Sequence, residues 1–183
     1  MADVYLDIVN ENDEIIDKAL RSEIHDKGLL HREIHVWFVT PDKKVIFQKR
    51  AANKDTYPNL LDATAGGHVE LGASYAETAL AEVLEETGIQ ITASEIYYID
   101  KVKSNAFDNI TGKTNHAYRE VYGYIFKGNT NDLVIEGDAG AGFKAVSLED
   151  IYNPTPELIS EIIGGHVAPE RQNIFKALEK LVA

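Results

Sequence analysis

Short runs of apolar residues alternate with polar turns along most of this chain, in the order of a mixed α/β protein. Two alternating runs, 5–9 and 14–19, flank a polar turn at 10–13 and predict an N-terminal hairpin over about residues 3–20. A second hairpin is expected where the runs 33–40 and 44–49 meet at Pro41. Residues 61–69 read as loop and strand, and the further strands expected are 96–103, 118–126 and 143–147.

The clearest helical periodicity follows the run 61–69 along the chain. Ser74 and Glu77 form a capping-box pattern and Gly88 suits a left-handed C-terminal cap, which predicts a helix beginning near Tyr75. Its apolar stripe is expected to face the core, and it consists of Ala76, Leu80, Val83, Leu84 and Thr87.

Two C-terminal helices are predicted over about 156–182, as 156–163 and 170–182, with a helical turn at 148–152. The stretches 105–115 and 128–142 are rich in Gly, Asn and Asp and read as loops. A second Gly-Gly-His, at 164–166, follows a helical pattern and reads as a helix cap and turn. No linker separates a second domain, so residues 1–183 are expected to form one domain.

The candidate chemistry lies on the polar side of the central helix. Glu82, Glu85 and Glu86 share an arc of roughly 100°, directly after the turn that contains Gly66 and Gly67. Carboxylates this close repel one another unless a cation lies between them. A hard divalent ion such as Mg²⁺ prefers such oxygens and keeps positions for water and phosphate. The alternative is a solvated acidic helix face.

The segment 66–89 resembles the signature of the Nudix hydrolase family. The positions that match are Gly67, Glu82, Val83, Glu85, Glu86, Gly88 and Ile89. Two positions depart from the signature, because Ala73 and Ala81 stand where the family has Glu and Arg. The resemblance implies an α/β/α sandwich, in which a mixed β-sheet is flanked by helices.

The resemblance also implies a metal site. Glu82, Glu85 and Glu86 would hold Mg²⁺, or Mn²⁺ in its place, with help from the backbone carbonyl of Gly66. One of these carboxylates, or Glu120 on the strand-like run 118–122, would activate water. The alternative for Glu120 is a solvent-facing position in an alternating strand.

Within that family, residues 3–150 look like the branch related to isopentenyl-diphosphate isomerase. The matching stretches are 31–35, 48–50, 54–58 and 61–68. That enzyme resembles this chain but uses a cysteine where Gly66 stands, and the chain has no cysteine. We therefore expect a hydrolase and not an isomerase.

The cationic and imidazole side chains of these stretches are candidates for binding substrate phosphate. Arginine offers a planar fork and lysine a compact charge. Arg32, Arg50, Lys54 and His68 are the candidates, with a surface role as the alternative for each cation and a buried structural role for the histidine.

Composition limits the partners. The net charge is −12, which argues against binding to a nucleic-acid backbone. The chain has no apolar run of about 18 residues and no basic-then-apolar N-terminal signal. We therefore expect a cytoplasmic protein with a small-molecule diphosphate substrate and no membrane partner. A homodimer is the family habit, which is an analogy.

The sequence thus leaves three functional hypotheses. The first is a Mg²⁺-dependent hydrolase that cleaves a diphosphate linkage in a nucleoside diphosphate derivative or a related organic diphosphate. The second is a non-catalytic nucleotide-binding or regulatory protein, which Ala73 and Ala81 suggest. The third, an isomerase of prenyl diphosphates, is disfavoured by the missing cysteine.

Overall fold

A computed structural model describes residues 3–54, 57–109, 111–135, 140–163 and 165–183. The N-terminal hairpin is confirmed as the antiparallel pair β1 (Tyr5–Val9) and β2 (Ile15–Leu20). It leads into α1 (Arg21–Lys27), which the sequence pattern did not predict. Seven residues span only two turns, so they are too short to show a helical period.

The main sheet is built around β3 (His31–Val39). One side of β3 pairs in parallel with β8 (Thr114–Ile125). On the other side, the first half of β3 pairs with β6 (Ala65–His68) and its end pairs with β4 (Lys44–Arg50). Because two strands share one side of β3, the sheet divides there, and this division lies beside the candidate site.

The outer strands complete a mixed seven-stranded sheet. β4 also pairs with β5 (Leu61–Asp62) and with β9 (Gly140–Ser147). β7 (Ile96–Phe107) pairs with β8 at the far edge. These two strands are longer than the sequence predicted: both ends of the expected loop 105–115, residues 105–107 and 114–115, are strand, since paired backbones tolerate the Asn that propensity disfavours.

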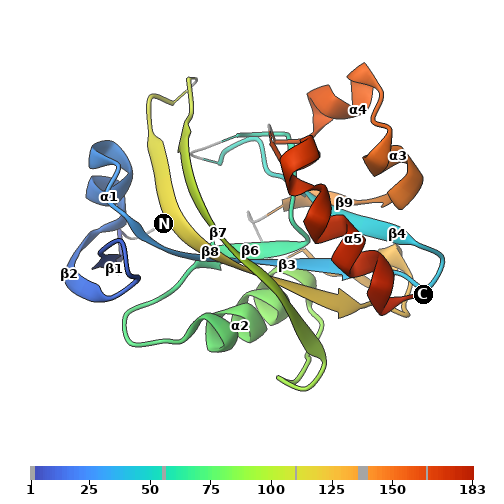
Figure 1. Ribbon diagram of the computed structural model, residues 1–183, viewed down its shortest axis with the longest axis horizontal. Coiled ribbons are helices and arrows are strands. Elements are labelled where there is room, and N and C mark those ends of the chain that lie inside the picture. The colour runs from blue at the N-terminus through green and yellow to red at the C-terminus, as the bar shows by residue number, and fades with distance from the viewer. Residues whose placement is uncertain (1–2, 55–56, 110, 136–139, 164) are drawn as a thin grey trace.

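Helices cover both faces of the sheet, as Figure 1 shows. α2 (Tyr75–Thr87) packs on one face against Ile34, Val36 and Phe38 of β3. α5 (Gln172–Leu181) packs on the other face against Trp37 and Val39, together with α3 (Leu148–Tyr152). The side chains of β3 alternate between these two cores, which is why the strand is almost wholly buried. The predicted sandwich is therefore confirmed.

The helices differ from the sequence pattern in three places, one in the buried side of a helix and two in where a helix begins or ends. Leu84 is 47% exposed, while Thr78 and Ala79 are buried in its stead, so the apolar stripe of α2 is rotated from the expected one. α4 (Pro156–Glu161) ends earlier than predicted, with Ile162 at its C-cap, because Ile162 forms a bridge to Leu61.

The last difference concerns the C-terminal segment. A 3₁₀ turn, Pro169–Arg171, precedes α5, so that helix begins later than the predicted 170. The second Gly-Gly-His is predicted to form a helix cap and turn: His166 does lie in a turn, where its N–H donates to the Ile163 carbonyl at 3.2 Å, but the C-cap of α4 is Ile162. The His166 side chain also contacts Asp62 of β5. Gly164 lies outside the described residues.

Candidate active site

α2 places two of the three predicted glutamates against β6, the strand that precedes it. The capping box of Ser74 and Glu77 forms as expected, with the Ser74 hydroxyl accepting from the Glu77 N–H and the Glu77 carboxylate accepting from the Ser74 N–H. Gly88 ends the helix in the left-handed conformation, with φ of 71°. The helix therefore begins and ends at fixed residues, which fixes the positions of the glutamates along it.

Glu82 and Glu86 face Gly66 and Gly67, which were expected to form a turn but lie within the strand β6 and pair with β3. The N–H of Gly66 donates to a Glu86 carboxylate oxygen at 3.0 Å. A Cβ added to Gly67 would overlap the carboxylate of Glu82, so only glycine lets this carboxylate lie so close to the backbone. Glu85, by contrast, is exposed on α2.

Burial perturbs both of these carboxylates. Burial, and then the charges of Glu86, Glu85 and Glu70, raise the pKa of Glu82 to about 8. Burial also raises the pKa of Glu86 to about 7, against the opposing effects of the Gly66 hydrogen bond and Lys54. A cation beside these oxygens would relieve the cost of ionising them, so the donor set suits a hard divalent ion.

Two of the predicted phosphate-binding cations lie on this side of the molecule. Lys54 is near enough to Glu82 and Glu86 for its charge to lower the pKa of both. Arg50 donates from Nη1 to a carboxylate oxygen of Asp62 at 2.9 Å. Asp62 and Arg50 also act on the pKa of Glu86. The structure thus brings Lys54 and Arg50 together with the glutamates.

Two predicted residues make their contacts elsewhere. Arg32 donates to Asp13 of the N-terminal hairpin at 2.7 Å and lies over the ring of Tyr75. Glu120 accepts from the Tyr122 hydroxyl at 2.5 Å and lies 3.7 Å from the Lys101 ammonium group. Neither has a described contact with Glu82 or Glu86, and their predicted catalytic and binding roles stay predictions.

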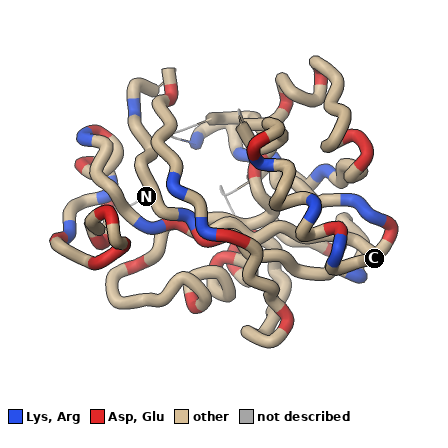
Figure 2. The backbone as a smooth tube through the Cα atoms, in the orientation of Figure 1, with Lys and Arg blue, Asp and Glu red and all other residues tan. Residues whose placement is uncertain are grey.

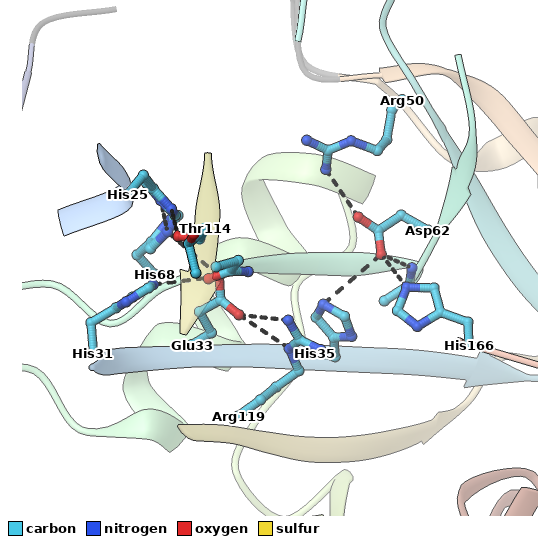
Figure 3. Close-up of polar contacts among 12 residues, drawn as sticks. His25, His31, Glu33, His35, Arg50, Asp62, His68, Thr114, Arg119 and His166 are labelled. Carbon is cyan, nitrogen blue, oxygen red and sulfur yellow. Dashed lines mark hydrogen bonds and ion pairs between the residues drawn. The ribbon is translucent and has the colours of Figure 1, made fainter. Parts of the chain in front are cut away.

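His68 belongs to a compact cluster of three histidines, drawn in Figure 3. The Nε2 atoms of His25 and His68 are 3.0 Å apart, and His31 stacks on His68. Burial lowers the pKa of His25 and His68, which favours the neutral rings. His68 therefore belongs to this cluster, and its predicted role in binding the substrate stays a prediction.

Second contacts fix the orientation of these rings. The Nδ1 atoms of His25 and His31 lie 3.4 Å and 3.0 Å from backbone carbonyl oxygens, of Thr114 and Leu29 respectively. The Nε2 atom of His31 is buried and has no hydrogen-bond partner among the described residues. Neutral imidazoles whose Nε2 atoms converge can hold a divalent ion that prefers nitrogen, such as Zn²⁺.

Glu33 lies beside the histidines and carries a buried ion pair. Its Oε1 is 3.5 Å from His68 Nε2, and its Oε2 accepts from Arg119 Nη2 at 2.6 Å. Asn115 donates to the same carboxylate at 2.9 Å. Glu33 and Arg119 are each at most 9% exposed, so this part of β3 carries a buried pair of opposite charges.

A second compact group contains His35, Asp62 and His166, and its ligand atoms lie within 4.8 Å of one another. The sequence reasoning missed Asp62, His166 and His25 as site residues. Asp62 carried a signal, because it lies in the stretch 61–68, on which the predicted resemblance to the isomerase-related branch rests. His166 and His25 carried none that points to these partners, since 104 residues separate His166 from Asp62.

Comparison with known proteins agrees with this arrangement. The model of the NUDIX domain matches residues 29–167. An uncharacterised Nudix hydrolase of Clostridium acetobutylicum is 30% identical over 154 residues, which are 82% of this chain and 73% of that protein. One of Streptomyces coelicolor is 41% identical over 87 residues, which are 48% of each chain, so that match spans about half of the relative.

Solved structures show the same fold. DR0079 of Deinococcus radiodurans superposes with a TM-score of 0.71 at 20% identity, over 93% of this chain and 98% of that one. The NUDIX domain of Shewanella oneidensis NrtR, solved with ADP ribose, gives a TM-score of 0.57 at 16% identity, over 83% and 87%. The chain therefore belongs to the Nudix family and is a Nudix-type diphosphate hydrolase.

Proposed function

We propose that this protein hydrolyses a diphosphate linkage in a nucleoside diphosphate derivative or a related organic diphosphate, with Mg²⁺ or Mn²⁺ as cofactor. The observation that carries the proposal is the pair Glu82 and Glu86, half-buried against the glycines of β6 with raised pKa values. Half-buried carboxylates with this environment favour binding of a cation.

The residues have distinct roles in this reaction. Glu82 and Glu86 would hold the ion, and the exposed Glu85 and the Gly66 carbonyl stay predicted ligands. When bound, a divalent ion lowers the pKa of water and neutralises charge that develops on the diphosphate. Lys54 and Arg50 would bind phosphate oxygens, so that the diphosphate lies beside the two glutamates.

Three features bear on the substrate and the setting. The solved relatives include one bound to ADP ribose and one described as an Ap4A hydrolase, which suggests nucleotide-derived diphosphates for the first assays. The resemblance to the isomerase-related branch adds prenyl diphosphates, although Gly66 replaces the cysteine.

Among the described residues no helix is long and apolar enough to cross a membrane, and we propose a cytoplasmic protein that is active alone or as a homodimer.

The proposal is tested by a variant of α2. Glu86→Gln should lower kcat by about 100-fold or more, because it removes a charge that the transition state needs. The assay should measure release of phosphate and nucleotide from nucleoside diphosphate derivatives, nucleoside triphosphates and prenyl diphosphates, with Mg²⁺, with Mn²⁺ and with chelator.

Glu157→Gln is the matched control, since Glu157 is exposed at the start of α4. It should keep full activity. Unchanged turnover in Glu86→Gln would contradict the proposal. If the wild-type protein binds a nucleotide without turnover, the regulatory hypothesis is correct, and restoring Glu at 73 and Arg at 81 becomes the next experiment.

A further inference from the structure

Asp62 joins two parts of the chain beside the glutamates. One of its oxygens accepts from Arg50 Nη1 at 2.9 Å, and the other lies 2.8 Å from Nε2 of His166. Burial alone would raise the pKa of Asp62, but the hydrogen bond from His166 and the nearby His35 and Arg50 hold that pKa well below its usual range. An ionised carboxylate only accepts, so Nε2 of His166 carries the proton.

This contact leaves the second ring nitrogen of His166 available. Its Nδ1 makes no hydrogen bond to a described residue. Among the described residues, Nδ1 is also not one of the fully buried polar atoms that lack a hydrogen-bond partner. The ring is also packed edge-on against Trp37 and His35, at centroid distances of 5.5 Å and 5.4 Å. One nitrogen is therefore fixed by Asp62, and the other can reach a ligand.

The group adjoins the glutamate site through a single residue. A Cβ at Gly66 would lie 2.9 Å from Cδ2 of His35, and the N–H of the same glycine donates to Glu86. His35 Nε2 lies 3.9 Å from Asp62. Figure 3 shows Arg50, Asp62 and His166 gathered at one end of the row of polar side chains above β3. A diphosphate beside Glu86 would thus lie within reach of His166.

The chemistry of the group favours an anion over a metal ion. The guanidinium of Arg50 would repel a cation at Asp62, and both carboxylate oxygens already accept N–H groups. A phosphoryl oxygen needs the opposite arrangement, a donor with a fixed direction beside a guanidinium. His166 protonated on both nitrogens would supply that donor between Asp62 and the phosphate.

We propose that Asp62 positions His166 so that its Nδ1–H donates to a phosphoryl oxygen of the substrate, next to Arg50. This inference rests on the proposed diphosphate substrate. His166 would be a substrate-binding residue that comes from the C-terminal segment, and Asp62 a positioning residue. The ligand class is an organic diphosphate whose second phosphoryl group extends from Glu86 toward β5.

Two substitutions separate the nitrogens of His166. The amide of Gln lies near the place of Nε2 and that of Asn near the place of Nδ1. His166→Gln should keep the Asp62 contact and the melting temperature but weaken binding of inorganic pyrophosphate by about tenfold or more, the loss of one charge-assisted hydrogen bond. His166→Asn should retain more of the binding. Calorimetry with Mg²⁺ and with chelator measures both.

The control is His116→Gln, because His116 lies on β8 with its Nδ1 near the Gly28 carbonyl. It should bind pyrophosphate as the wild type does. Wild-type affinity and wild-type KM in His166→Gln would overturn the inference while leaving the hydrolase proposal intact. Loss of tight Zn²⁺ binding in His166→Gln, with pyrophosphate binding unchanged, would overturn it in favour of a metal site.

A measurement on the wild-type protein covers the case in which a variant fails to fold. The ¹⁵N resonance of His166 Nδ1 should shift when pyrophosphate is titrated in, and an unchanged resonance at saturation would overturn the inference. If no diphosphate is hydrolysed by the wild type but this resonance shifts, the hydrolase proposal fails and the anion contact stands.

Discussion

Glu82 and Glu86 are the residues whose surroundings differ most from those of an ordinary helix surface. Each is half-buried against the backbone of Gly66 or Gly67 in β6, and the charge of Glu86 acts on Glu82. Both effects favour the protonated carboxyl over the carboxylate. In the metal-free protein, ionising these two carboxyl groups therefore costs free energy, and this is the position where a cation would bind.

This cost predicts a pH dependence of stability. The pKa values of Glu82 and Glu86 are about 8 and about 7 in the folded chain and 4.5 when unperturbed. Below about pH 4.5 the contribution of these raised pKa values to the free energy of unfolding is fully present. As the pH rises toward 8, the folded chain holds protons that the unfolded chain has lost, so the free energy of unfolding falls. With chelator present, the melting temperature should fall over this range.

The double variant Glu82→Gln with Glu86→Gln should remove most of that slope, because neither amide ionises. Adding Mg²⁺ at pH 8 should raise the melting temperature of the wild type and leave the double variant unchanged. A slope equal in the two metal-free proteins would show that other groups cause it.

At the scale of elements, α2 determines the site because it carries both glutamates and packs its other side into a core. Ala79 and Val83 are fully buried under β3 and β6. The capping box sets where the helix begins, and Gly66 and Gly67 of β6 lie against Glu86 and Glu82 in its second half. Removing one capping interaction should therefore lower the free energy of unfolding more than it lowers turnover.

Ser74→Ala should lower the free energy of unfolding by about 1 kcal/mol, the usual value of an N-cap side chain. The hydroxyl of Ser74 both accepts from the Glu77 N–H and donates to its carboxylate at 2.7 Å. Urea unfolding monitored by circular dichroism measures the change.

Ser160→Ala is the matched control, because Ser160 is exposed on α4 and caps no helix. It should change stability by less than about 0.5 kcal/mol. Equal losses in both variants would contradict the role given to the capping box.

At the scale of the whole molecule, polar side chains from many elements meet in a row on β3. His25 comes from α1, His31 from β3 and His68 from β6, and the C-terminal segment adds His166. Acidic and basic residues are interspersed along the tube of Figure 2. The negative net charge is thus compatible with local positive groups that receive an anion.

The histidine cluster predicts a response to metal. Zn²⁺ in slight excess should raise the melting temperature of the wild type, because ligands that bind only the folded state stabilise it. His31→Gln should lose most of that rise, since it removes the buried Nε2, which makes no hydrogen bond to a described residue and lies 3.7 Å from Glu33 Oε1. His116→Gln should keep it, and loss of the rise in both variants would place the ion elsewhere.

The sequence by itself determined the features that depend on neighbours along the chain. The capping box, the Gly88 cap, the acidic side of α2 and the N-terminal hairpin all follow from spacing within a few residues, where propensity and periodicity act. The predicted glutamates, and the glycines that receive them, were recognisable for the same reason.

Only the tertiary structure decided which distant residues meet. The exposure of Glu85 and Leu84 depends on how α2 is rotated against the sheet, and the length of β7 and β8 depends on their mutual pairing. Asp62 and His166 come together because Ile162 bridges Leu61, which fixes the C-terminal segment to the sheet. Such contacts arise from sheet register and packing, which leave no periodic signal in the sequence.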